Sequence, residues 1–234
     1  METGTLIKKS GYLLSGIGGR TFLVDSGIPF SVGRGTLELC GRSFRLVQSP
    51  LSSFTPASIS KVVDVAVDGI IGGDILRALG CRFDLAHNTI VFDPAVPANV
   101  APIPCQPRSI GGTPLPVITI EAFNRPLALG FDSGSPLAYV MPGTCAFPGQ
   151  ADGSRQEYVG MLDAWSTVDF WNGASFIGGD CYQLEFAILP EPLPTLLRFT
   201  GAPVDGLFGS GLAELAAVTL AAGWNEFYVE KYAA

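Results

Sequence analysis

The stretch Phe22-Leu23-Val24-Asp25-Ser26-Gly27 recurs in similar form as Ala128-Leu129-Gly130-Phe131-Asp132-Ser133-Gly134-Ser135. Each copy is an apolar run that ends in Asp-Ser-Gly. A second motif also occurs twice, first as Val67-Asp68-Gly69-Ile70-Ile71-Gly72 and later as Val204-Asp205-Gly206-Leu207-Phe208-Gly209. Because the two motifs keep the same order, we predict an internal duplication in which two equivalent turns build one site.

The spacing of the motifs differs between the halves. Asp25 and Asp132 are 107 positions apart, whereas Gly72 and Gly209 are 137 apart, so the second half holds 30 additional residues between its two motifs. These residues fall within about 145–180, where two alternating segments flank Gly160–Asp163 and predict a β-hairpin. A hairpin present in only one half is a candidate lid.

Composition limits the class of protein. The chain has 234 residues, of which 47% are hydrophobic and 15% charged, so it can fill a sizeable core. The net charge is −7, and no cluster of Lys and Arg provides the basic face that a nucleic-acid partner needs. The sequence contains no apolar run of about 18 residues, so no membrane span is predicted. No signal peptide is visible either, and we therefore expect a cytoplasmic protein. Five cysteines without a Cys-x-x-Cys motif and a single histidine predict neither a disulfide scaffold nor a metal site.

The frequent glycines and short alternating segments favour an all-β fold with short helices. A strand is expected before each Asp-Ser-Gly, a hairpin over 82–92 and a short helix over 75–79. The sequence also predicts a helix over about 212–222, followed by a last strand near 226–229. Seven prolines between Pro94 and Pro116 indicate a linker.

Paired carboxylates suit one kind of chemistry. Two carboxyl groups about 3 Å apart cannot both ionise, so such a pair can offer a base for water and a proton donor at the same time. The glycine of each turn permits a tight bend that brings backbone N–H groups to the carboxylate. Each serine hydroxyl can form a bond to the opposite turn and so hold the two loops together.

With these motifs the chain resembles the aspartic peptidases of the retropepsin/pepsin clan, in which an apolar strand ends in Asp-Thr/Ser-Gly and a later apolar-apolar-Gly strand leads into a helix. The resemblance implies a two-lobed acid-protease β-barrel fold with an internal pseudo-twofold, like two fused retropepsin halves. It places an N-terminal lobe at 1–97, a Pro-rich linker at 98–116 and a C-terminal lobe at 117–234. Residue Ile28 departs from the family, which usually has Ala, Ser or Thr there, whereas Ser135 keeps the usual type.

The resemblance also implies a function and residue roles. The chain would be an aspartic endopeptidase that hydrolyses an extended peptide or protein substrate as a monomer, without a cofactor or metal. The implied catalytic pair is Asp25 and Asp132, with Ser26 and Ser133 as the hydroxyl lock. Substrate backbone would bind to Gly27, Gly134 and Ser135. The hairpin near 155–170 would be a single flap on the second lobe, with Tyr158, Gly160 and Trp165 as candidates and the choice between the two aromatics open.

Two other interpretations remain at this point. The chain could be a catalytically inactive peptide-binding module on the same fold, which the residues cannot separate from an enzyme. It could also be a structural protein whose Asp-Ser-Gly turns are incidental, in which case the two carboxyl groups would lie far apart.

Overall fold

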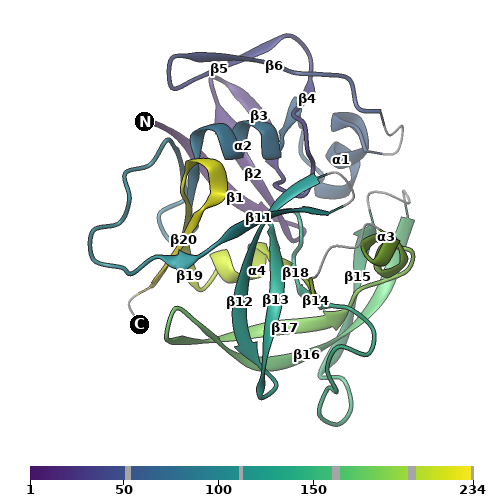
Figure 1. The fold of residues 1–234 in the computed structure, drawn as a ribbon. Coiled ribbons are helices and arrows are strands. Elements are labelled where there is room, and N and C mark those ends of the chain that lie inside the picture. The colour runs from purple at the N-terminus through teal and green to yellow at the C-terminus, as the bar shows by residue number, and fades with distance from the viewer. Residues whose placement is uncertain (51–53, 111–112, 160–163, 200–203, 233–234) are drawn as a thin grey trace.

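The structure, a computed structural model, describes residues 1–50, 54–110, 113–159, 164–199 and 204–232. Strands make up 52% and helices 13% of the molecule, which confirms the predicted all-β fold with short helices. Figure 1 shows two lobes: elements of the first half lie in the upper part of the view, and most elements of the second half lie below them.

Within the described residues, the first lobe is built on a ten-stranded sheet. Its order is β10 (Ile103–Pro104), β20 (Glu226–Lys231), β19 (Ala216–Leu220), β8 (Cys81–Asp84), β9 (Thr89–Phe92), β1 (Glu2–Lys9), β2 (Tyr12–Ile17), β3 (Arg20–Val24), β7 (Gly69–Ile71) and β4 (Val32–Gly33). A separate hairpin of β5 (Thr36–Leu39) and β6 (Arg42–Arg45) buries Leu37 and Leu39 in the core. The first lobe therefore uses its own hairpin for packing.

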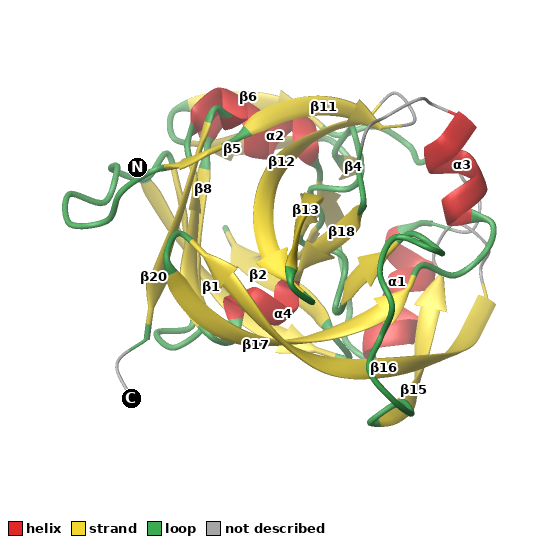
Figure 2. Ribbon diagram, turned by 60° about the horizontal axis from the view of Figure 1, so that its bottom comes forward, coloured by secondary structure: helices red, strands yellow, loops and turns green. Residues whose placement is uncertain are grey.

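The second lobe is built on an eight-stranded sheet in the described part of the chain. Its order is β11 (Gln106–Ile110), β12 (Thr113–Ala122), β13 (Arg125–Asp132), β18 (Gly206–Gly209), β14 (Ala138–Val140), β17 (Asp180–Ile188), β16 (Ala164–Ile177) and β15 (Gly153–Val159). Short helices lie against both sheets: α1 (Pro56–Val63), α2 (Gly73–Leu79), α3 (Leu193–Phe199), α4 (Ser210–Ala213) and the 3-10 turn η1 (Ala222–Trp224). Figure 2 shows these helices around the strands.

The two halves repeat one arrangement. In the first, β3 runs parallel to β7, and α2 follows β7 directly. In the second, β13 runs parallel to β18, and α4 follows β18 directly. Helices α1 and α3 precede the inner strands β7 and β18 in the same way. This repetition is the pseudo-twofold that the duplicated motifs predict.

The predicted helix over 212–222 is wrong. Helix α4 ends at Ala213, and the chain then forms β19, which pairs with β8 on one side and β20 on the other. All five residues of β19 are buried, including the β-branched Val218 and Thr219. Burial on both faces and pairing on both edges therefore outweigh the high helix propensity of the neighbouring alanines.

The predicted linker segment contains regular structure. Strand β10 pairs with β20 in the first sheet, whereas β11 pairs with β12 in the second. Strands β19 and β20 also come from the second half of the chain but extend the first sheet. The lobes are thus joined by shared strands as well as by the covalent connection, and the lobe boundaries at 97 and 117 stay a prediction.

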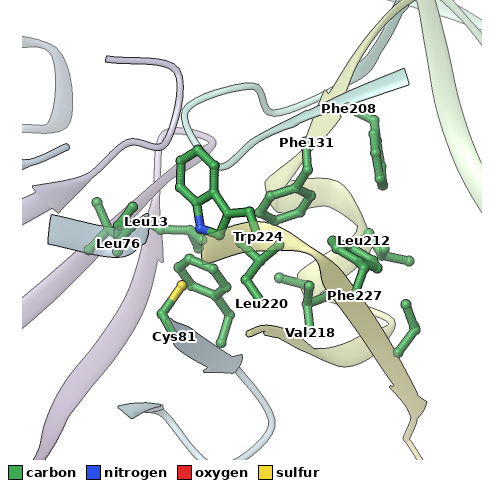
Figure 3. Close-up of a cluster of buried hydrophobic side chains, with 14 of the residues drawn as sticks. Leu13, Leu76, Cys81, Phe131, Phe208, Leu212, Val218, Leu220, Trp224 and Phe227 are labelled. Atoms are coloured by element: carbon green, nitrogen blue, oxygen red, sulfur yellow. The ribbon is translucent and has the colours of Figure 1, made fainter. Parts of the chain in front are cut away.

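A shared core lies between the sheets. Trp224 is fully buried there, and the ring of Phe131 lies 6.0 Å from that of Phe83 and 5.3 Å from that of Phe227. Figure 3 shows Trp224, Phe131 and Phe227 in one cluster with Leu13 and Leu76 from the first half. Because Phe131 immediately precedes Asp132, this packing anchors the end of the strand that carries the second carboxylate.

Candidate active site

The two aspartates occupy equivalent ends of strands. Asp25 follows β3, and its N–H donates to the carbonyl oxygen of Ile71 at 3.0 Å. Asp132 is the last residue of β13 and is paired with Gly209 at the end of β18. In each half, the strand that carries the aspartate therefore lies beside the inner strand formed by the second motif.

Backbone groups of each turn hold the carboxylates. The N–H of Gly27 donates to Oδ1 of Asp25, and the N–H of Gly134 donates to Oδ1 of Asp132, both at 2.9 Å. These bonds are the ones expected from a tight Asp-Ser-Gly turn. They orient both carboxyl groups in the same way relative to their own strands.

Ser26 and Ser133 form a reciprocal lock between the turns. The N–H of Ser26 donates to Oγ of Ser133, and the N–H of Ser133 donates to Oγ of Ser26, each at 2.9 Å. Each hydroxyl also donates to the opposite strand: Ser26 to the carbonyl oxygen of Phe131 at 3.1 Å and Ser133 to that of Val24 at 3.0 Å. Both serines are fully buried. Four hydrogen bonds thus hold the two aspartates opposite each other.

The glycines of the two turns leave room for the opposite carboxylate. A Cβ atom on Gly27 would lie 2.5 Å from Oδ2 of Asp132, and one on Gly134 would lie 2.6 Å from Oδ2 of Asp25. Neither glycine has a positive φ. Glycine is therefore required here by the close approach of the other half, and the two carboxyl groups lie next to each other between the turns. This contradicts the interpretation in which the two turns are incidental and far apart.

A second symmetric pair of aspartates supports the strands behind the turns. Oδ2 of Asp68 accepts from the N–H of Thr21, and Oδ2 of Asp205 accepts from the N–H of Ala128, both at 2.8 Å. The N–H of each aspartate donates back to the carbonyl oxygen of the same partner at 2.7 Å. Asp68 and Asp205 thus join the strand that leads to the turn with the loop before the inner strand.

The electrostatics of the pair are those of two coupled acids. Burial raises the pKa of Asp25 well above its ordinary value, and the neighbouring charge of Asp132 and a hydrogen bond to it raise that pKa further. Burial also raises the pKa of Asp132, although hydrogen bonds from Gly134, Asp25 and Ser135 oppose the rise. One proton shared by the pair near neutral or mildly acidic pH is the consequence.

The predicted hairpin of the second half is present and extends to the first lobe. Strands β15 and β16 pair from Gly153↔Phe170 to Val159↔Ala164, and we refer to them as the 153–170 hairpin. Gly160 lies outside the described residues, as do residues 161–163.

The two candidate aromatic residues of this hairpin differ in position. Tyr158 is only 8% exposed and packs in an apolar cluster that otherwise belongs to the first lobe, with Ile59 and Val63 of α1 among its members. Trp165, which is paired with Tyr158 across the hairpin, is 55% exposed. Tyr158 therefore fastens the hairpin to the first lobe, whereas Trp165 borders open space.

A cavity of about 730 Å³ lies beside this hairpin. Its wall includes Trp165 and Glu157 from the hairpin, Gly11 from the β1–β2 turn, and Pro136 and Gly209 from the flank of the Asp132 turn. Neither aspartate of the pair lines it. The cavity thus lies along the flank of the second turn and does not include the carboxylates.

Sequence reasoning missed several residues around the pair. The hydroxyl of Tyr12 donates to the carbonyl oxygen of Tyr158 at 2.9 Å, so the first lobe also holds the hairpin by a hydrogen bond. Glu157 is 7% exposed and forms an ion pair with Arg155, whose Nε lies 2.6 Å from Oε1. The alternation of polar and apolar residues along β15 could have indicated that one face points inward. Only the fold shows which residues that face contacts.

Among the described residues, no group of three or more His, Cys, Asp or Glu side chains could hold a metal ion. In the same part of the chain, no helix has the length and apolar character needed to cross a membrane.

Comparison with known proteins finds a likeness in structure. No family model matches the chain, and no curated protein matches it in sequence. Among solved structures, the chain is similar to the aspartic proteinase from Irpex lacteus, with 10% sequence identity and a TM-score of 0.47. The match covers 99% of this chain and 97% of that one.

Proposed function

We propose that the chain is an aspartic endopeptidase that hydrolyses peptide bonds with a water molecule activated by Asp25 and Asp132. The observation that carries the proposal is the meeting of the two carboxyl groups across the reciprocal Ser26–Ser133 lock. Such a pair combines a base and an acid in one place without a covalent intermediate.

The reaction follows from the shared proton. The ionised carboxylate takes a proton from the water as its oxygen attacks the carbonyl carbon of the scissile bond. The protonated partner donates its proton to the carbonyl oxygen, which gives a neutral tetrahedral diol. When the C–N bond breaks, the amine leaves with a proton from the pair, and the second product is a carboxylic acid.

An extended substrate would need a strand edge to bind along. Strand β15 lies at the edge of the second sheet, and among the described strands it pairs with β16 alone. A peptide in an extended conformation can add hydrogen bonds along such an edge, which is a general mode of peptide recognition. The cavity beside the Asp132 turn would then receive substrate side chains, and one chain would suffice because both aspartates belong to it.

The deciding experiment is digestion of a peptide library between about pH 3 and 7. The wild-type protein should cleave internal bonds, and Asp25→Asn and Asp132→Asn should each reduce the rate by at least about 100-fold, since general acid–base catalysis contributes about 10²–10⁴. A statine-type peptide should inhibit the cleavage. If wild type and both variants cut nothing, the proposal fails.

That failure leaves a defined alternative. A catalytically inactive peptide-binding module on the same fold would retain peptides from the library without cutting them, and Asp25→Asn would bind them as well as the wild type does.

A further inference from the structure

The cavity beside the 153–170 hairpin has a wall that is partly apolar and partly charged. Its volume of about 730 Å³ is typical of a ligand site. Leu137, Phe208 and Leu212 contribute to the apolar part of the wall. The charged part is formed by Lys8, Arg155, Glu157, Glu185 and Glu214. A cavity of this composition suits a side chain that has an apolar stem and a charged end.

Both cations of this wall are already paired with carboxylates. Nζ of Lys8 lies 2.9 Å from Oε1 of Glu214. Nε of Arg155 lies 2.6 Å from Oε1 of Glu157, and its Nη1 donates to Oε2 of Glu185 at 2.9 Å. Three carboxylates thus accompany two cations, which leaves one negative charge in excess. An anionic ligand would have to displace a carboxylate from its partner, whereas a cationic ligand would be attracted without breaking either pair.

Two of the three carboxylates can be reached by a ligand. The side chain of Glu214 is 55% exposed and that of Glu185 is 41% exposed, whereas that of Glu157 is only 9% exposed. Glu185 lies on β17, which packs against α4, and Glu214 directly follows α4. Adjoining elements therefore present two accessible carboxylates to one cavity.

Trp165 adds an exposed indole ring to the same wall. The residue is 55% exposed, and its ring centroid lies 5.7 Å from that of the buried Tyr158, which supports it from the other strand of the hairpin. An indole attracts an ammonium or guanidinium group that lies within about 6 Å of its ring centroid, over the ring face. The aromatic ring and the carboxylates of this cavity therefore favour the same kind of ligand.

We propose that this cavity is a subsite for a basic side chain, lysine or arginine, of the peptide substrate. Glu185 and Glu214 select the charge of that side chain, and Trp165 forms the aromatic wall beside it. The inference rests on the proposed peptidase function and deepens it, because it names the class of peptide that the chain prefers.

The position of the cavity fixes where the basic residue lies in the substrate. Gly209, which is paired with Asp132, belongs to its wall, and so does Pro136, four residues after Asp132. One peptide can therefore reach both the carboxyl pair and the cavity. Because neither Asp25 nor Asp132 lines the cavity, the basic residue lies away from the scissile bond, at one fixed position.

The test is a positional library of eight-residue peptides, in which each position in turn is lysine, arginine, norleucine, glutamine or glutamate. Cleavage products are identified by mass spectrometry. At one position relative to the cleaved bond, lysine and arginine should give a kcat/KM about tenfold higher than norleucine, which has the apolar stem without the charge. At that position glutamate should be cleaved more slowly than glutamine.

Variants of the wall connect the preference to the cavity. Glu185→Gln and Glu214→Gln should each lower the ratio of lysine to norleucine by roughly threefold, and the double variant should abolish it. Trp165→Leu should lower the ratio as well, because it removes the aromatic face. The matched control is Glu38→Gln, which changes the net charge equally at an exposed residue of β5 outside the cavity and should keep the ratio.

Binding to Asp25→Asn separates this inference from the proposed function, because it requires no cleavage. Fluorescence anisotropy with the same labelled peptides should show tighter binding of the lysine peptides than of the norleucine peptides, and the double variant should remove the difference. A wild type that cleaves peptides without a basic preference, or a preference that survives in the double variant, would overturn the subsite and leave the peptidase function in place. A protein that cleaves nothing but binds lysine peptides through Glu185 and Glu214 would refute the peptidase function and retain the subsite.

Discussion

Substitution of Ser133 by alanine tests the lock on which the site depends. The change removes one buried hydroxyl that accepts from the N–H of Ser26 and donates to the carbonyl oxygen of Val24. Water cannot replace the two lost hydrogen bonds, because Ser26 and Val24 are fully buried. An unsatisfied buried polar group costs about 1–3 kcal/mol, so the two together should lower the free energy of unfolding by about 2–6 kcal/mol.

The assay is urea-induced unfolding followed by tryptophan fluorescence and far-UV circular dichroism. Ser26→Ala should give a similar loss, because its hydroxyl makes the equivalent bonds with Ser133 and Phe131. The matched control is Ser175→Ala: Ser175 is equally buried, but its hydroxyl has no hydrogen-bond partner among the described residues. Because this change removes an unsatisfied buried hydroxyl, the control should be at least as stable as the wild type.

The reasoning would be refuted if Ser133→Ala were as stable as Ser175→Ala. It would also be refuted if Ser26→Ala and Ser133→Ala differed by several kcal/mol, because the structure gives the two hydroxyls the same number and kind of bonds.

Three further changes have defined outcomes. The pKa values of the pair are raised in the folded protein, so the folded protein keeps protons that the unfolded chain releases. The free energy of unfolding therefore falls as the pH rises above the ordinary carboxyl range. Asp25→Asn should therefore raise Tm at pH 7 and change it little near pH 3, and calorimetry showing a lower Tm at pH 7 would contradict the raised pKa values. Gly27→Ala places a Cβ atom against Asp132, so it should lower kcat/KM by at least about 100-fold and stability by about 1–3 kcal/mol; wild-type activity in a peptide assay would show that the turns are further apart. Asp205→Ala removes the acceptor for the N–H of Ala128 and should cost about 1–3 kcal/mol in urea unfolding, and Asp68→Ala should cost about the same by symmetry.

The elements closest to the carboxylates could be predicted from the sequence because their signals are local and occur twice. The apolar run before Asp25 and the Ile70-Ile71-Gly72 motif can each be recognised from a few residues. In the fold, the two strands that they form lie side by side. The repetition at Asp132 and Gly209 then indicates that both belong to one site. The additional hairpin could be predicted for a similar reason, because the second half holds 30 additional residues and they show an alternating pattern.

Other features depend on distant partners and could not be predicted. Residues 216–220 have an alanine-rich composition that favours a helix, but β8 offers an unpaired edge, and no local signal reveals it. Helix α1 buries only Ile59 and Val63, which is too short an apolar stripe to stand out. The tight turn at Gly27 could be predicted, but the close approach of the Asp132 carboxylate to Gly27 could not, because that carboxylate comes from the other half of the chain.

The shared sheet also has a consequence for synthesis on the ribosome. Strand β8 emerges more than a hundred residues before β19, which is its partner, so the first lobe of the nascent chain has an uncovered sheet edge. Such an edge can pair with another chain, and closing it requires a contact of high sequence separation. The carboxylates therefore reach their final support only when β19 and β20 have left the exit tunnel.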